Sequence, residues 1–129
     1  MGRSAPGTNV RDFRKLIVWH KAHDLTLSVY VETKVFPSAE RFGLTSQLRR
    51  AAVSIEANIA EGCGRESPRE LLHHLAIAAG STSECECLVQ IASDLALLDI
   101  ERGHALMTQA QEVRRMLAAY SQHFRTPDS

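Results

Sequence analysis

Two Glu-x-x-His motifs are the residues best suited to metal chemistry in this sequence. They are Glu70 with His73, and Glu101 with His104. In some four-helix bundles, two such motifs and two further glutamates hold a pair of metal ions. Here each motif begins its predicted helix, and the two helices are expected to run in opposite directions. A separation of about 30 residues at 1.5 Å each places the motifs about 45 Å apart, so we expect no di-metal site.

The cysteines and the other histidines do not indicate a catalytic centre either. Cys85-x-Cys87 lacks the two- to four-residue spacing and the second pair that are usual for zinc. Residues two apart on a helix diverge by about 200°, so we expect Cys85 to be a small core residue. His20, His23 and Asp24 are expected to form a polar, partly packed helix face. With no phosphate-binding loop or nucleophile elbow in the sequence, we expect no enzyme activity, metal or cofactor.

A polar stripe follows the second long helix that the sequence predicts. Its members recur in steps of three or four residues, which places them on one helix face: Gln47, Arg50, Ser54, Asn58 and Glu61. On the next helix, Glu84 follows Ser81 within an otherwise apolar row that also contains Ile77, Leu88, Ile91 and Leu95.

The turn between these two helices sets their register. If it is centred near Arg65, Glu84 lies level with residue 46, close to Gln47 and Arg50. We expect Glu84 to be half-buried and paired with one of them, because breaking a buried ion pair costs about 3–5 kcal/mol. Two interpretations stay open. The polar residues form a structural network that fixes register, or they face a subunit interface or a ligand.

Charge is divided unevenly along a chain whose net charge is zero. Residues 1–50 carry nine Lys and Arg against four Asp and Glu, whereas residues 51–129 carry six against eleven. The simpler interpretation is that adjacent helices attract each other. The alternative is that the basic half lines a surface for an anionic partner. The candidate nucleic-acid contacts are Arg49, Arg50, Lys21, Lys15 and Arg14.

Long segments without Pro or Gly predict an all-α fold for these 129 residues. The expected helices span about residues 16–36, 45–62, 68–98 and 100–124, and Ser67 and Asp99 are expected to cap the last two. Short connections favour an antiparallel up-down-up-down four-helix bundle. We expect a flexible arm at 1–14, a bundle domain at 15–125 and a flexible tail at 126–129.

The sequence contains no apolar run near the roughly 20 residues of a membrane span. Its first residues lack the apolar centre of a secretion signal. Three cysteines, an odd number, fit a reducing compartment better than a disulfide framework. We therefore expect a cytoplasmic protein that makes no contact with a membrane.

Several motifs together resemble the proteins named after intervening sequences of 23S rRNA genes, also labelled S23 ribosomal proteins. The likeness spans about residues 13–124. It is carried by Leu16-Ile17-Val18-Trp19 with Ala22, Phe36-Pro37 with Glu40, Phe42-Gly43-Leu44 with Gln47-Leu48-Arg49-Arg50-Ala51, Ser54-Ile55 with Asn58-Ile59-Ala60-Glu61-Gly62, and Ala79-Gly80-Ser81 with Glu84. Cys63, Cys85, Cys87 and the His73-His74 pair look particular to this chain.

The resemblance implies a left-handed antiparallel four-helix bundle that assembles with itself, commonly as a ring of five. The family is similar to accessory proteins of diversity-generating retroelements, whose basic-lined pentamers bind nucleic acid and a reverse transcriptase. A ring would repeat Arg49 and Arg50 around its axis. The expected function is therefore a non-enzymatic oligomeric scaffold that binds RNA or a nucleic-acid-processing protein. The alternative is a protein–protein interaction adaptor with no nucleic-acid contact.

Overall fold

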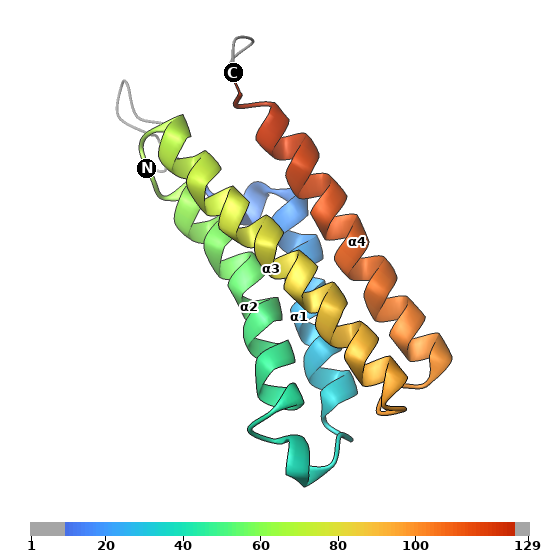
Figure 1. Cartoon of the computed structure of the whole chain (residues 1–129). Coiled ribbons are helices and arrows are strands. Elements are labelled where there is room, and N and C mark those ends of the chain that lie inside the picture. Colours follow the sequence, from blue (N-terminus) through green and yellow to red (C-terminus); the bar gives the residue numbers. More distant parts are fainter. Residues whose placement is uncertain (1–9, 126–129) are drawn as a thin grey trace.

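The computed structural model of the chain describes residues 10–125 (Figure 1). Within that range the regular structure is helical, and no strand is present. The long helices are α1 (Ile17–Thr33), α2 (Leu44–Cys63), α3 (Pro68–Asp94) and α4 (Ile100–Gln122). Short 3₁₀ turns at Phe13–Lys15 and Ser38–Glu40 precede α1 and α2. The predicted all-α class with four helices is therefore confirmed.

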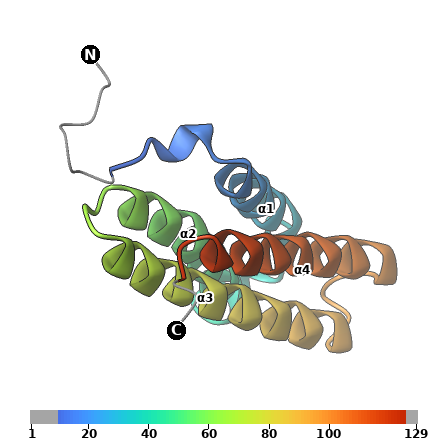
Figure 2. The same cartoon turned by 90° about the horizontal axis from the view of Figure 1, so that it is seen from above.

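The four helices pack as a bundle around one apolar core. Helix α1 contacts α2 and α4, while α3 contacts the other faces of α2 and α4 (Figure 2). The connections α1–α2 and α3–α4 lie at one end of the bundle, and the α2–α3 connection lies at the other (Figure 1). No described helix is both long and apolar enough to pass through a bilayer.

Side-chain caps begin α3 and α4 at the predicted residues. The Ser67 hydroxyl accepts a hydrogen bond from the backbone N–H of Glu70 at 3.1 Å, and Pro68 occupies the first helical position. The Asp99 carboxylate accepts from the N–H of Arg102 at 2.8 Å. Each cap satisfies a backbone donor that has no partner within its own helix.

Helices α1 and α3 end a few residues earlier than predicted. Helix α1 stops at Thr33 instead of residue 36, and α3 stops at Asp94 instead of residue 98. After α3, Ala96 adopts a left-handed φ of 60°. The N–H groups of Ala96 and Leu97 donate to the carbonyls of Ser93 and Ala92 at 3.0 and 2.9 Å. This pair of bonds is the Schellman motif, which closes a helix end.

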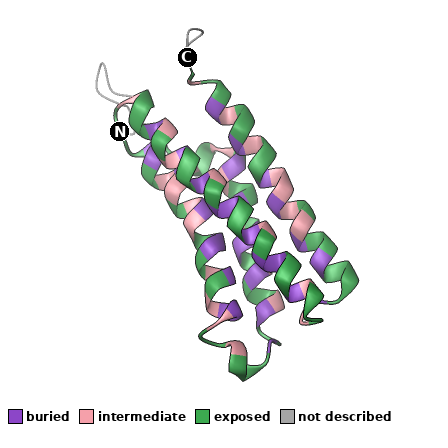
Figure 3. Ribbon diagram, in the orientation of Figure 1, coloured by how far each residue is buried: buried purple, intermediate pink, exposed green. Residues whose placement is uncertain are grey.

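Each of α2, α3 and α4 contributes one apolar row to the core. On α4, the buried row contains Leu106, Ala110, Val113 and Leu117. On α3, the row that faces the core is Leu71, Leu75, Ala78, Cys85, Val89 and Ala92 (Figure 3). Of the row that contains Glu84, Ser81 and Leu88 are buried, whereas Ile77, Glu84, Ile91 and Leu95 are exposed. Helix α3 thus carries apolar residues on two faces, and one of these faces supplies most of its contacts with the bundle.

The described part of the predicted N-terminal arm lies against the bundle. The backbone N–H of Arg11 donates to the carbonyl of Cys63 at 2.8 Å, and its guanidinium lies 4.6 Å from the centre of the Phe124 ring. Residues 10–14 are thereby connected to the ends of α2 and α4. The remainder of the predicted arm and the predicted tail, residues 1–9 and 126–129, lie outside the described residues.

Candidate functional site on helix α2

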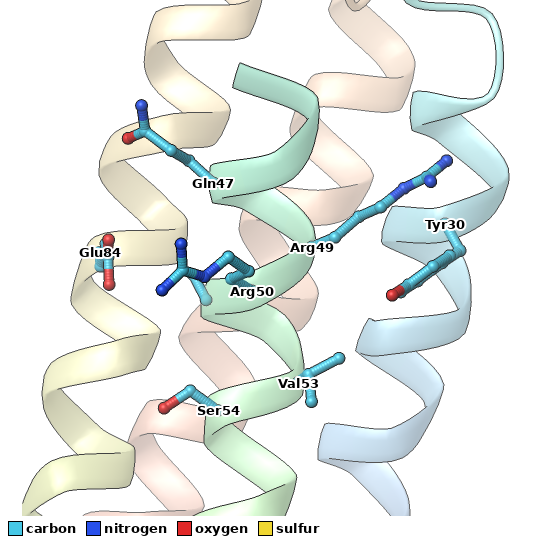
Figure 4. Close-up of a pocket in the computed structure, with 8 residues that line it drawn as sticks. Tyr30, Gln47, Arg49, Arg50, Val53, Ser54 and Glu84 are labelled. Atoms are coloured by element: carbon cyan, nitrogen blue, oxygen red, sulfur yellow. The ribbon is translucent and has the colours of Figure 1, made fainter. Parts of the chain in front are cut away.

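The exposed side of α2 carries a shallow hollow of about 700 Å³. Several of its lining residues belong to the predicted polar stripe and its partners on α3. It is lined by Tyr30, Gln47, Arg49, Arg50, Ala51, Val53, Ser54 and Glu84. Figure 4 shows the side chains of Arg49 and Arg50 leaving α2 in different directions, toward Tyr30 on α1 and toward Glu84 on α3. The two neighbouring arginines therefore have different surroundings.

Arg49 is held by two residues of α1. Its guanidinium carbon lies 4.5 Å from the centre of the Tyr30 ring, and its Nε donates to the Thr33 hydroxyl at 2.9 Å. The Thr33 hydroxyl in turn donates to the carbonyl of Val29 at 2.7 Å. Stacking on an aromatic face and a directed N–H bond fix a guanidinium more firmly than surface solvation does. Sequence reasoning missed Tyr30 and Thr33 as partners of this arginine.

Arg50 occupies the other side of the hollow with Gln47 and Glu84. The structure places these three residues around one hollow, near the register expected from the α2–α3 turn. Within residues 10–125, however, no ion pair or hydrogen bond joins Arg50 to Glu84. The expectation that Glu84 is half-buried is wrong, because the carboxylate is exposed to solvent. Water solvates both charges, so neither of them requires a protein partner.

The other half of the polar stripe forms a hydrogen-bonded chain between α2 and α3. The hydroxyls of Ser54 and Ser81 share a hydrogen bond of 2.9 Å, and Asn58 donates to the Ser54 carbonyl at 2.9 Å. The Nδ1 of His74 donates to Oδ1 of Asn58 at 3.2 Å, because an amide oxygen only accepts. The Nε2 of His74 lies 3.7 Å from Glu61.

His74 belongs to this hydrogen-bonded network, although the sequence did not identify it as a member. If the α2–α3 turn is centred at residue 65, the α3 residue that lies level with Asn58 is within one helical turn of His74. The register of the two helices therefore predicts that His74 lies near Asn58. His74 thus lies in one network with Ser54, Asn58, Glu61 and Ser81. Gln47, Arg50 and Glu84 lie beyond its end, in the open hollow.

The remaining predicted cations do not join Arg49 and Arg50. Lys21 lies 3.5 Å from Glu112 of α4, and Arg14 pairs with Asp12 at 3.3 Å. Lys15 borders a different hollow, between the start of α1 and the end of α4. Lys15 precedes the start of α1 at Ile17, which is 13 residues before Tyr30, or about 20 Å along the helix. Within one copy, Lys21, Lys15 and Arg14 therefore lie apart from the hollow that Arg49 and Arg50 share.

The two Glu-x-x-His motifs also lie on different parts of the bundle. Glu70 and His73 lie in the first two turns of α3, whereas Glu101 and His104 lie in the first two turns of α4. In the described part of the chain, no three His, Cys, Asp or Glu side chains gather as metal ligands. His23 instead contacts Glu56, with 3.0 Å between Nδ1 and Oε2.

The three cysteines are free thiols, and two of them are buried. Cys85 is a core residue, as predicted, and burial raises the pKa of its thiol to about 12. Cys63 is buried between the helices as well, and burial raises the pKa of its thiol. Cys87 is exposed.

Comparisons with known proteins place the chain in a family. The model of the 23S rRNA-intervening sequence protein family matches residues 14–119. A crystal structure at 1.70 Å of a protein of unknown function from the S23 ribosomal protein family of Bacteroides thetaiotaomicron has a similar fold. The TM-score is 0.75 at 20% identity, over 81% of this chain and 98% of that chain. No curated protein matches the chain. Because the family model covers most of its length, the chain belongs to the 23S rRNA-intervening sequence protein family.

Proposed function

We propose that this protein is a non-enzymatic scaffold that assembles with itself and binds RNA or a nucleoprotein through basic surface formed on assembly. The observation that supports this best is the pair of arginines on the exposed side of α2. Arg49 is held in place by Tyr30 and Thr33, while Arg50 has no ion pair within residues 10–125. A fixed guanidinium beside a free one suits contact with successive phosphates.

Assembly supplies the charge that one copy lacks. The chain is neutral overall, and Lys21 and Arg14 are already paired with carboxylates. A closed ring repeats each surface once per copy. A ring of five, as the family resemblance implies, would present five copies of the Arg49–Arg50 pair. The polar chain from Ser54 to His74 supports this role because it fixes the register of α3 beside the arginines.

The proposal includes the finer topology of the bundle. We propose that successive helices run antiparallel, up-down-up-down, with a left-handed twist between them. Short connections at alternate ends support this arrangement (Figure 1). Three free thiols support a reducing compartment, and we propose that the protein acts in the cytoplasm.

An RNA titration with a matched charge reversal tests the proposal. We would measure binding of a fluorescein-labelled single-stranded RNA by anisotropy, for the native protein, Arg50→Glu and Arg115→Glu. Arg115 is an exposed arginine on α4, outside the hollow, and serves as the control. Arg50→Glu should weaken binding and lower the salt slope by about 0.7 for each lost phosphate contact. Equal affinity and equal slope for all three proteins would refute the proposal.

The adaptor function is the alternative, and one observation favours it. Leu27 and Val31 on α1, and Val35 just after the end of that helix, follow one another at four-residue spacing with 53, 59 and 75% of their surfaces exposed. Such a stripe is typical of a surface that another protein covers. The solution mass separates the two functions. An oligomer is expected for the scaffold, whereas a monomer that binds no RNA would favour the adaptor.

A further inference from the structure

One end of the bundle carries an unusual concentration of exposed apolar side chains. The connections α1–α2 and α3–α4 both lie at this end (Figure 1). Between them, Arg102 of α4 forms an ion pair with Glu32 of α1 at 3.3 Å. We call this end the tip. It is defined by Val35, Phe42, Leu95 and Ile100, which are 75, 88, 60 and 89% exposed. Removing such apolar side chains from water lowers the free energy, so the tip is a candidate interface.

The charges of the tip are divided between its two connections. Residues 34–42 contain Lys34 and Arg41 and one carboxylate, Glu40, which already accepts from the backbone N–H of Leu44 at 3.2 Å. Residues 94–101 contain three carboxylates and no cation. They are Asp94, Asp99 and Glu101. One side of the tip is therefore basic, and the other side is acidic.

The neighbouring groups leave much of this charge available. Arg102 contacts Asp99 at 3.7 Å as well as Glu32, so its positive charge neutralises part of the negative charge on the acidic side. Asp94 accepts from the amide of Gln90 at 2.9 Å. Within residues 10–125, Lys34 and Glu101 have no ion pair. A surface with opposite charges on its two halves is complementary to a second copy of itself turned by 180°.

We propose that the tips of two copies associate end to end about a two-fold axis. The α1–α2 side of one copy then covers the α3–α4 side of the other, and the reverse contact forms at the same time. Phe42 and Val35 would pack against Leu95 and Ile100 of the second copy, while Lys34 and Arg41 would face Asp94 and Glu101. The contact is distinct from the hollow on α2, so the proposal goes beyond RNA binding and does not depend on it.

The charges also favour a second copy over a lipid surface. Anionic membranes attract clustered lysines and arginines. At the tip, the carboxylates lie beside Leu95 and Ile100, two of the most exposed apolar residues, and would repel an anionic membrane. In a ring of several copies, tips at one end would join two rings face to face, so the association is expected to double the mass of whatever assembly the sides form.

Charge reversals on the two sides of the tip give a test with an internal rescue. One variant carries K34E and R41E, and another carries D94K and E101K. Asp99 is left unchanged because it caps α4. In either variant alone, like charges face each other in the two-fold contact, so the mass from analytical ultracentrifugation should fall by half. An equimolar mixture of the two, or one chain with all four substitutions, restores opposite charges and should restore the native mass.

Three controls make the outcome decisive. Circular dichroism checks that each variant keeps its helices, and Arg115→Glu controls for charge reversal away from the tip. RNA anisotropy follows the Arg50 surface separately, so failure of RNA binding leaves this test unaffected. The proposal is overturned if both double variants keep the native mass, or if the mixture stays at the lower mass. Capture of the native protein, but not of the variants, by phosphatidylserine vesicles would overturn it as well.

Discussion

Arg49 and Arg50 are adjacent in the sequence, yet the structure predicts that only Arg49 contributes to folding stability. The perturbation is a pair of matched substitutions, Arg49→Gln and Arg50→Gln. Glutamine removes the charge and the aromatic stacking while retaining helix propensity close to that of arginine. Arg49 loses its contacts with Tyr30 and Thr33. Arg50 loses no ion pair or hydrogen bond that the structure shows within residues 10–125.

The expected magnitude follows from those contacts. A partly exposed cation–π contact contributes about 0.5–1 kcal/mol. A hydrogen bond from a charged donor adds about 1.5 kcal/mol, the lower part of its range, because solvent still reaches the guanidinium. Thr33 keeps its bond to Val29, which limits the loss. We expect Arg49→Gln to lower the free energy of unfolding by about 1–2 kcal/mol, and Arg50→Gln to change it by less than about 0.5 kcal/mol.

Urea unfolding followed by circular dichroism measures this difference. With an m-value of about 2 kcal/mol/M, the Arg49→Gln midpoint should fall by about 0.5–1 M at an unchanged slope. A double-mutant cycle with Tyr30→Leu should give a coupling energy of about 0.5–1 kcal/mol. Equal midpoints for the two glutamine variants would refute the reasoning. A coupling energy near zero would show that Tyr30 does not hold the guanidinium.

Three further predictions concern the backbone and the thiols. Ala96→Gly should raise the free energy of unfolding by about 1 kcal/mol, because φ is 60° there and glycine accepts that conformation without strain; a loss in urea unfolding would contradict this. Gly62→Ala should destabilise by about 1–3 kcal/mol, since its Cβ would lie 3.0 Å from Cβ of His74 and 3.1 Å from Leu71. Gly64→Ala, where the nearest atom is 3.5 Å away, is the control. At pH 8, iodoacetamide should modify one thiol per folded chain, and none in Cys87→Ser, because Cys85 has a pKa of about 12 and stays protonated; mass spectrometry showing modified Cys85 would disprove it.

Much of the fold follows from short-range signals in the sequence. The side chains of Ser67 and Asp99 cap the helices that follow them. The row from Leu106 to Leu117 repeats at steps that leave one buried face. The two caps were predicted correctly, and such a single apolar row is readable from the sequence, because each depends on residues within a few positions of one another.

The end of α3 and its buried face were not predictable in the same way. A Schellman motif usually carries glycine at its left-handed position, and Ala96 gives no such signal. Helix α3 also offers two apolar rows, and only packing against α2 and α4 selects the one that contains Leu75, Cys85 and Val89. Sequence period alone does not decide between two such faces.

The candidate site was predicted in part for a related reason. The register set by the α2–α3 turn predicts that Glu84 lies near Gln47 and Arg50, and all three residues line the hollow. The contact of Arg49 with Tyr30 and Thr33 depends on how α1 packs beside α2, and the sequence does not reveal which α1 residues face α2 at this level. Sequence also gives no measure of solvent access, which is why the expectation of a half-buried Glu84 failed.

The pairing of α1 with α4 has a consequence for how the chain folds. The other helix pairs are neighbours in sequence, so short connections bring them together with little loss of chain entropy. The Glu32–Arg102 contact instead spans 70 residues. Closing that loop is expected to come after the local pairs have formed. Substitutions at the α1–α4 seam, such as Lys21→Ala, should therefore speed unfolding more than they slow refolding, and α1 should show weaker amide-exchange protection than α3.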